Sequence, residues 1–243
     1  MDFYQSISKY YQYIFPLNKM QLDFIGKSHP QAKDQLSILD IGCAIGDLSL
    51  ELAESYQKVI GIDLDKGMID KAITKGKNYK NLEFHLQNML ELDTAFESNS
   101  FDIIACFGNT LVHLNSNEEV LQFFRNAKAV LKKDGKLLFQ IINYDRIIDQ
   151  KIDHLPTIEN DVIKFERNYK YHSSLGKVDF ETILSIKEND NSIQNCIALL
   201  ALRKSKIEEL LHKAGFSNIS FFGNFKRENL TENSMPLIVE AYN

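Results

Sequence analysis

The sequence predicts an α/β fold in which a mostly parallel sheet is covered by helices on both faces. Short apolar runs typical of buried strands alternate with segments of helical spacing, and residues 151–203 interrupt this order with β-prone runs alone. The length of 243 residues, with 44% hydrophobic and 25% charged residues, suits one domain with its own core. We expect a single domain over 1–243, with 151–203 as an antiparallel insertion forming a lid and 1–28 as an N-terminal helical cap.

The expected elements follow in regular order along the chain. The strands are residues 37–41, 59–64, 82–89, 101–107, 136–143, 216–225 and 236–242. A helix is expected at about 47–56, and another has Met68, Ile69, Ala72 and Ile73 on one face. The clearest helix begins at a capping box of Ser116 and Glu119 and stops near Gly135. A last helix opens with Ser205 and Glu208, and Gly215 fits the position after its end.

The insertion has no helical spacing. Its three β-prone runs cover residues 162–172, 177–187 and 192–202. The segments SSLG (173–176) and END (188–190) separate them as turn signals.

Charge and cysteine content exclude several classes of protein. The chain has 28 Lys and Arg against 33 Asp and Glu, a formal charge of −5, whereas a protein that binds duplex nucleic acid or anionic membranes carries a basic excess. Cys43, Cys106 and Cys196 cannot all pair, and neither they nor the six histidines show metal spacing. The longest apolar run, 196–202, is far too short to cross a bilayer. We expect a cytoplasmic protein with no metal site and with neither nucleic acid nor membrane as partner.

A glycine-bearing turn joins the first strand to the first helix in LDIGCAIGDLSLELA (Leu39–Ala53), where small residues let a ligand approach the backbone. A dinucleotide fingerprint would need glycine at three positions that here hold Gly42, Ala44 and Asp47, so only one fits. An acidic Asp47 would also oppose a pyrophosphate at the helix start. The Gly-Lys-Ser/Thr ending of a P-loop is absent.

The motif DIGCAIG, followed by Asp63 at the end of the next strand, resembles the class I S-adenosylmethionine-dependent methyltransferases. Asp40, Gly42 and Gly46 match the family pattern, while Ala44 replaces its middle glycine. The resemblance implies a Rossmann-like sheet with an antiparallel last strand, S-adenosyl-L-methionine as cofactor and S-adenosyl-L-homocysteine as product. The cationic cofactor suits a nearby carboxylate such as Asp40, and Asp63 can accept both ribose hydroxyls.

The resemblance implies further cofactor-binding residues. Leu64 and Met68, in GIDLDKGMIDKA, match positions that flank the adenine, where a thioether against a ring is favourable. Asn88 with Met89 stands where the family usually has an aspartate that reads the adenine amino group, and an asparagine oxygen can still accept. We also assign Phe107, at the end of the fourth strand, to the cofactor site.

Two segments resemble a narrower group, the glycine and sarcosine N-methyltransferases: CFGNTLVHL (106–114) and INYD (142–145). The resemblance places Asn109 beside the methyl acceptor and His113 near the amino-acid end of the cofactor. We assign Asn109, His113 and Tyr144 to the catalytic site.

One position departs from the group pattern RNYD, in which the arginine holds the acceptor carboxylate. Here the residue is Ile142, and an apolar side chain cannot replace a bidentate carboxylate clamp. Arg146 and Arg167 are the candidates to compensate, and the sequence does not choose between them.

Aromatic residues crowd the amino terminus, namely Tyr4, Tyr10, Tyr11, Tyr13 and Phe15. A helix there either folds an aromatic face over the sulfonium or packs on the domain. We expect direct in-line methyl transfer to a small-molecule acceptor, with an amine nitrogen preferred. Small-molecule O-methylation, a non-catalytic binding module and a nucleotide-binding oxidoreductase are the alternatives, and the sequence predicts no oligomeric state.

Overall fold

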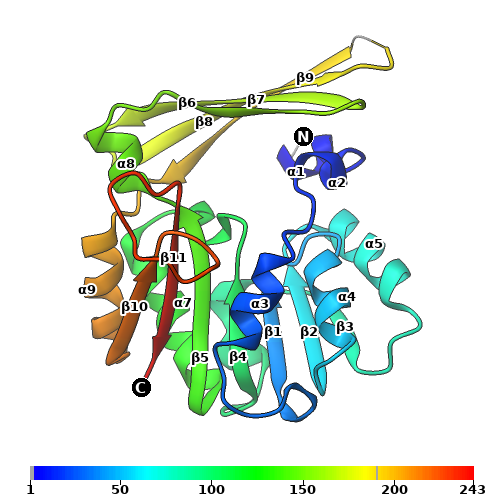
Figure 1. The fold of residues 1–243 in the computed structure, drawn as a ribbon, viewed down its shortest axis with the longest axis vertical. Coiled ribbons are helices and arrows are strands. Elements are labelled where there is room, and N and C mark those ends of the chain that lie inside the picture. Colours follow the sequence, from blue (N-terminus) through cyan, green and yellow to red (C-terminus); the bar gives the residue numbers. More distant parts are fainter. Residues whose placement is uncertain (1–2, 190) are drawn as a thin grey trace.

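Within residues 3–189 and 191–243, which the computed structural model describes, seven strands form one twisted sheet in the order β10-β11-β5-β4-β1-β2-β3 (Figure 1). These strands are β1 (Ser37–Ile41), β2 (Lys58–Asp63), β3 (Leu82–Leu86), β4 (Phe101–Cys106), β5 (Leu131–Ile142), β10 (Asn218–Phe222) and β11 (Pro236–Tyr242). The pairs from β5 to β3 are parallel, and β11 is antiparallel to both of its neighbours. The expected fold, including the antiparallel last strand, is confirmed.

Helices cover both faces of this sheet. The longer ones are α4 (Asp47–Ala53), α5 (Lys66–Gly76), α7 (Asn117–Val130) and α9 (Lys204–Ala214). Side chains of α7 and α9 share one apolar core with Leu39 and Phe139, whereas α3 (Met20–Gly26) and α4 pack in a second core with Ile38 and Leu138 on the opposite face. Because both faces are buried, the strands are continuous apolar runs, and this made them readable from the sequence.

Shorter helical segments connect these elements. They are α1 (Phe3–Ile7), α2 (Tyr11–Ile14), α6 (Leu92–Ala95), α8 (Tyr144–Asp149) and the 3₁₀ turns Lys33–Gln35, Met89–Glu91 and Thr110–His113. The segment expected as a helical cap at 1–28 thus contains α1, α2 and α3, and its residues 1–2 lie outside the described part of the chain.

A second, antiparallel sheet stands over the carboxyl ends of the parallel strands, with α1 and α2 beneath it (Figure 1). Its order is β6 (His154–Glu159), β7 (Ile163–His172), β8 (Lys177–Ile186) and β9 (Asn191–Leu200). The three β-prone runs of the insertion are therefore strands. Sequence reasoning missed β6, which contains Pro156 and a register shift, both tolerated at a sheet edge. The expected END turn includes residue 190, which lies outside the described residues.

Three helix boundaries differ from expectation, and the first is the end of α4, at Ala53 rather than near residue 56. Helix α7 ends at Val130 rather than near Gly135, because β5 already begins at Leu131 and its pairing with β4 then shifts register. Helix α9 begins at Lys204 without a cap from Ser205; instead the Lys204 backbone N–H donates to the Asp145 carboxylate of α8 at 2.8 Å. A cap supplied by another element leaves no local sequence signal.

A further difference concerns Gly46, which we expected to leave room for a ligand. It precedes α4 with φ +82°, and a Cβ there would lie 2.6 Å from the Phe84 ring and 3.0 Å from the Ala72 methyl. Gly46 is therefore required by the backbone conformation and by packing within the fold.

We predict that Gly46→Ala lowers the free energy of unfolding by roughly 2–5 kcal/mol, because left-handed strain adds to overpacking. Gly108→Ala is the matched control: Gly108 has φ +74°, but no atom lies within 4 Å of a Cβ built there. The control should lose only about 1–2 kcal/mol. Urea denaturation of both variants checks this, and equal losses would contradict the packing role.

Candidate functional site

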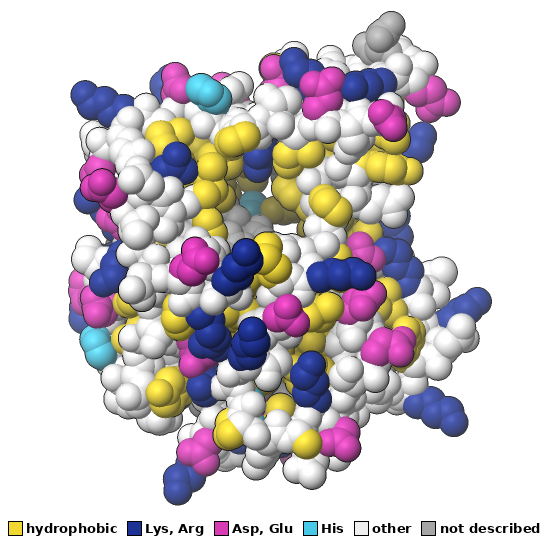
Figure 2. All heavy atoms as spheres, in the orientation of Figure 1, with side chains coloured by type: hydrophobic (Ala, Val, Ile, Leu, Met, Phe, Trp, Pro, Cys, Tyr) yellow, Lys and Arg dark blue, Asp and Glu magenta, His cyan; other side chains and the backbone are white. Residues whose placement is uncertain are grey.

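A cavity of about 540 Å³ lies at the carboxyl ends of β1, β2 and β4, beneath the four-stranded sheet. The strand order places β1 between β2 and β4, a point where an open α/β sheet leaves a crevice for ligands. The N-terminal helices and Ile197 of β9 cover the cavity from the other side. Figure 2 shows a hollow lined by hydrophobic side chains between the two sheets.

The loop after β1 is fixed by contacts with β2. The backbone N–H groups of Gly42 and Cys43 both donate to the Ile62 carbonyl, at 2.8 and 3.0 Å. Gly42 has φ +70°, and a Cβ there would lie 2.5 Å from the Thr110 hydroxyl. Ala44, with φ +48°, adopts a left-handed conformation that its methyl group makes costly. The loop therefore packs tightly between β2 and the turn at 110–113.

Asp63 at the end of β2 joins this loop to the next one. Its Oδ2 accepts from the Ala44 N–H and its Oδ1 from the Asp65 N–H, both at 2.9 Å. Burial raises the pKa of Asp63, and the two backbone hydrogen bonds oppose that shift. The carboxylate is thus a fixed acceptor at the cavity wall with lone pairs left for a ligand.

Two more carboxylates face the cavity with little solvation. Asp40 is buried and accepts a 2.6 Å hydrogen bond from the Ser49 hydroxyl. Burial raises the pKa of Asp40 to about 7; the Ser49 bond opposes the shift, and the neighbouring Asp63 adds to it. Asp65 caps α5 through Oδ1, which accepts from the Met68 N–H at 2.9 Å, while its buried Oδ2 has no hydrogen-bond partner in the described structure.

The charge of the lining is one-sided. The carboxylates of Asp40, Asp47, Asp63 and Asp65 line the cavity, and among the described residues no lysine or arginine does. Such a wall repels phosphates and favours a ligand that carries positive charge and several hydroxyl or amino donors. The apolar part includes Met68, which packs with Ala44 and Ile45.

Most of the residues assigned to the cofactor meet at this cavity. Those in the lining are Asp40, Gly42, Ala44, Asp63, Leu64, Met68, Met89 and Phe107. Gly46 and Asn88 are not in the lining. Asn88 uses its side-chain oxygen to accept from the Leu90 N–H at 3.0 Å, so its neighbours Gln87 and Met89 face the cavity instead. Sequence reasoning missed Asp65, Gln87 and Thr110; only Asp65 had a signal, as a cap before a helix.

The three residues assigned to catalysis are placed differently. His113 lines the cavity, and its Nε2 lies 2.9 Å from the Tyr4 hydroxyl of α1. Asn109 and Tyr144 are outside the lining: Asn109 accepts from the Ile142 N–H at 2.9 Å and donates to the Tyr144 hydroxyl at 3.4 Å. Tyr144 is fully buried, and burial raises its pKa. The structure therefore joins Asn109 to Tyr144 and His113 to Tyr4.

The N-terminal aromatic side chains divide between cavity and core. Tyr4, Tyr11 and Phe15 line the cavity, Tyr10 packs beneath the four-stranded sheet, and Tyr13 is exposed. Part of this cluster therefore faces the cavity and part packs on the domain.

Comparisons with known proteins agree with this geometry. A family model described as a methyltransferase domain matches residues 38–135. The demethylmenaquinone methyltransferase of Lactococcus lactis is 30% identical over 193 residues, which cover 76% of this chain and 68% of the relative. The glycine/sarcosine N-methyltransferase of Aphanothece halophytica is 28% identical over 191 residues, covering 78% and 69%.

A solved structure shares the whole fold. The S-adenosylmethionine-dependent methyltransferase of Clostridium acetobutylicum superposes with a TM-score of 0.81 at 16% identity, covering 99% of both chains. The chain belongs to the class I S-adenosylmethionine-dependent methyltransferases. Within the described residues, no group of three or more His, Cys, Asp or Glu side chains could hold a metal ion, and no helix is long and apolar enough to cross a membrane.

We predict a pH-dependent stability difference between the wild type and Asp40→Asn. Because burial raises the pKa of Asp40 from 3.8 to about 7, the native state holds a proton that the unfolded state releases. This stabilisation is complete below pH 4 and is lost as pH rises through 7, a change on the order of 4 kcal/mol. Urea unfolding of both proteins from pH 4.5 to 7.5 measures it; parallel curves would contradict the shift.

Proposed function

We propose that this S-adenosylmethionine-dependent methyltransferase methylates an amine nitrogen of a small molecule by direct in-line transfer. The observation that carries the cofactor assignment is the acidic cavity at the glycine loop, with carboxylates but no Lys or Arg in its described lining. The bound cofactor supplies an electrophilic methyl group on a sulfonium. The relative that acts on glycine and sarcosine supports a nitrogen acceptor.

In this proposal, different residues of the chain bind different parts of the cofactor. Asp63 accepts the ribose hydroxyls, since its backbone hydrogen bonds already fix its orientation. Met68, Leu64 and Met89 hold the adenine between apolar surfaces, and Asp40 balances the positive charge. The orphaned Asp65 oxygen provides a further acceptor at the same end of the cavity.

At the acceptor end, we propose that the four-stranded sheet within 151–203 is a lid and that the helices of 1–28 form a cap. Together they exclude water from the cavity, so that alignment of donor and acceptor supplies much of the rate. Asn109 positions the acceptor and holds Tyr144, while His113 receives or relays a proton at Nε2 with the Tyr4 hydroxyl beside it. The net charge of −5 favours a small molecule over a nucleic acid as the acceptor.

Two measurements test the proposed function. Thermal unfolding should rise with S-adenosylhomocysteine and stay unchanged with NAD. Release of S-adenosylhomocysteine should then be followed over a panel of small amines and matched alcohols. If only the alcohols are methylated, the acceptor atom is oxygen rather than nitrogen. If S-adenosylhomocysteine binds but no amine or alcohol of the panel is methylated, a non-catalytic binding module is favoured.

We predict that Asp63→Ala weakens S-adenosylhomocysteine binding at least ~100-fold, because two hydrogen bonds to a charged acceptor are lost. Asp47→Asn is the matched control, since the Asp47 carboxylate also lines the cavity but pairs with Lys75 at 2.5 Å. The control should change affinity by less than about threefold. Calorimetry compares the two, and unchanged affinity in Asp63→Ala would refute the ribose assignment.

We predict that Asn109→Ala lowers kcat roughly 10- to 100-fold, because a misplaced acceptor loses alignment. Affinity for S-adenosylhomocysteine should stay nearly unchanged, since the Asn109 side chain lies outside the cavity lining. Tyr144→Phe removes only the hydroxyl that Asn109 contacts and should act in the same direction. Steady-state kinetics measure kcat, and calorimetry measures the affinity for S-adenosylhomocysteine. Equal losses in the two quantities would contradict the placement of Asn109 beside the acceptor.

A further inference from the structure

A polar row crosses the underside of the four-stranded sheet, where its neighbours are apolar. Arg167 of β7 pairs directly with Thr182 of β8, which pairs with Asn195 of β9. Directly paired residues of antiparallel strands share a face, so the three side chains form one row. We call these three residues the Arg167 row.

The rows on either side show which face this is. One flanking row, Phe165 with Leu184 and Ile193, packs on the N-terminal helices. The other, Tyr169 with Phe180 and Ile197, includes a residue that lines the cavity. Adjacent rows are about 7 Å apart, twice the rise per residue of a strand. The Arg167 row therefore faces the interior, one row from the methyl-transfer cavity.

Two atoms of this row lack partners where partners are expected. Thr182 is only 2% exposed, and its hydroxyl makes no hydrogen bond in the described structure. The buried Nε of Arg167 is equally unpartnered. Arg167 donates to the Pro156 carbonyl at 2.5 Å, and within the described chain it forms no ion pair. Burial lowers the pKa of Arg167, as expected for a cation held away from water without a counter-charge.

We propose that Arg167, with the Thr182 hydroxyl beside it, binds a carboxylate of the methyl acceptor. This inference rests on the proposed function and names the class of its substrate: amines that carry a carboxylate. A planar guanidinium with free donors binds a carboxylate in a bidentate manner, and the orphaned hydroxyl adds a third donor. Arg167, on the four-stranded sheet, would thus bind the carboxylate that the apolar side chain of Ile142 cannot bind.

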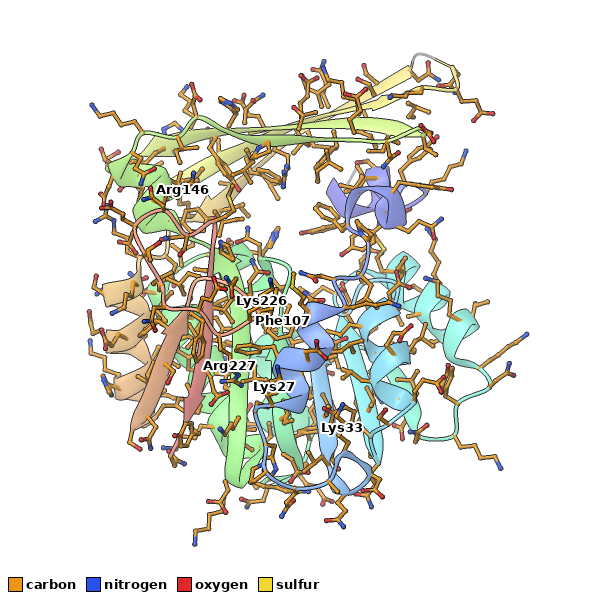
Figure 3. All side chains as sticks on the ribbon, in the orientation of Figure 1. Lys27, Lys33, Phe107, Arg146, Lys226 and Arg227 are labelled. Atoms are coloured by element: carbon orange, nitrogen blue, oxygen red, sulfur yellow. The ribbon has the colours of Figure 1, made fainter. Side chains whose placement is uncertain are left out.

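The location of the row suits an acceptor. Tyr169 lies two residues from Arg167 on the same strand and belongs to the same apolar core as Tyr144, which Asn109 contacts. An acceptor held by Arg167 therefore extends its amine toward the residues assigned to catalysis. Arg146, the other candidate, lies on α8 below the left end of the four-stranded sheet in Figure 3, and its Nη1 contacts the Met235 sulfur at 3.4 Å.

The surface outside the opening favours an anion as well. Lys and Arg side chains gather below the hollow in Figure 2, although the whole chain has a charge of −5. Lys27 and Lys226, labelled in Figure 3, belong to this group, and neither forms an ion pair within the described residues. Positive charge beside a cleft raises the local concentration of an anionic substrate.

The experiment compares acids with their amides as acceptors of the full-length enzyme, using glycine and β-alanine against glycinamide and β-alaninamide. Arg167→Gln should raise KM for the acids at least tenfold and leave S-adenosylhomocysteine affinity within twofold. Thr182→Val should raise KM about threefold or more while its melting temperature stays equal or rises, because the lost hydroxyl had no partner. Lys170→Gln, exposed on the other face of β7, is the control and should match the wild type.

Other outcomes are equally decisive. Amides methylated as well as acids, or an unchanged KM in Arg167→Gln, would overturn the inference and leave the proposed function standing; so would a preference for O-phosphoethanolamine. If S-adenosylhomocysteine binds but no amine is methylated, the proposed function is wrong and the carboxylate site is tested separately. The melting temperature of the wild type should then be higher in acetate than in chloride at equal ionic strength, and that of Arg167→Gln should be the same in both salts. If the two proteins respond alike, the carboxylate site is overturned.

Discussion

The arrangement of the cavity depends on one partly buried carboxylate that accepts hydrogen bonds from two loops. Asp63 ends β2, receives the Ala44 N–H from the loop after β1 and the Asp65 N–H from the loop that leads to α5. Both loops are thereby fixed to the same side chain. Asp40 is buried nearby, and the proximity of Asp63 adds to the rise of its pKa, so the fold alone disfavours the ionised form of Asp40. In the function proposed above, the cationic cofactor would favour that ionised form.

The part of the molecule above the cavity is built from segments far apart in sequence. Ile7 and Ile14 of the N-terminal helices pack against Phe165 and Ile186 of the four-stranded sheet. Tyr4 reaches His113 from the same helices, and Asn195 of β9 donates to Ser6 at 2.9 Å. The N-terminal helices and the four-stranded sheet thus contact each other as well as the cavity.

The sequence allowed the parallel sheet, the glycine loop and the acidic residue after β2 to be predicted, because each has a local pattern. Strands buried on both faces are apolar runs, and Gly42 marks the turn between the first strand and helix. The features that could not be predicted from the sequence depend on tertiary contacts. The cap of α9 comes from Asp145, and the requirement for glycine at position 46 comes from Phe84.

The same limit applies to the site residues. Asn88 matched a family position, yet its side chain caps a local turn, while its neighbours face the cavity. Arg167 and Thr182 are 15 residues apart in the chain and form one row only through the register of β7 with β8. No spacing rule predicts that pairing, whereas cross-strand register makes it evident.

In Figure 1 the N-terminal end of the chain lies beneath the four-stranded sheet, whereas the C-terminal end lies at the foot of the parallel sheet. Helix α1 is beside the cavity and supplies the hydroxyl that contacts His113, whereas β11 lies between β10 and β5 and runs away from the cavity to its last residue. An affinity tag or fluorophore joined ahead of α1 would therefore perturb ligand entry. The same addition after Asn243 would leave the cavity untouched, which makes that terminus the one for immobilising the enzyme on a sensor surface.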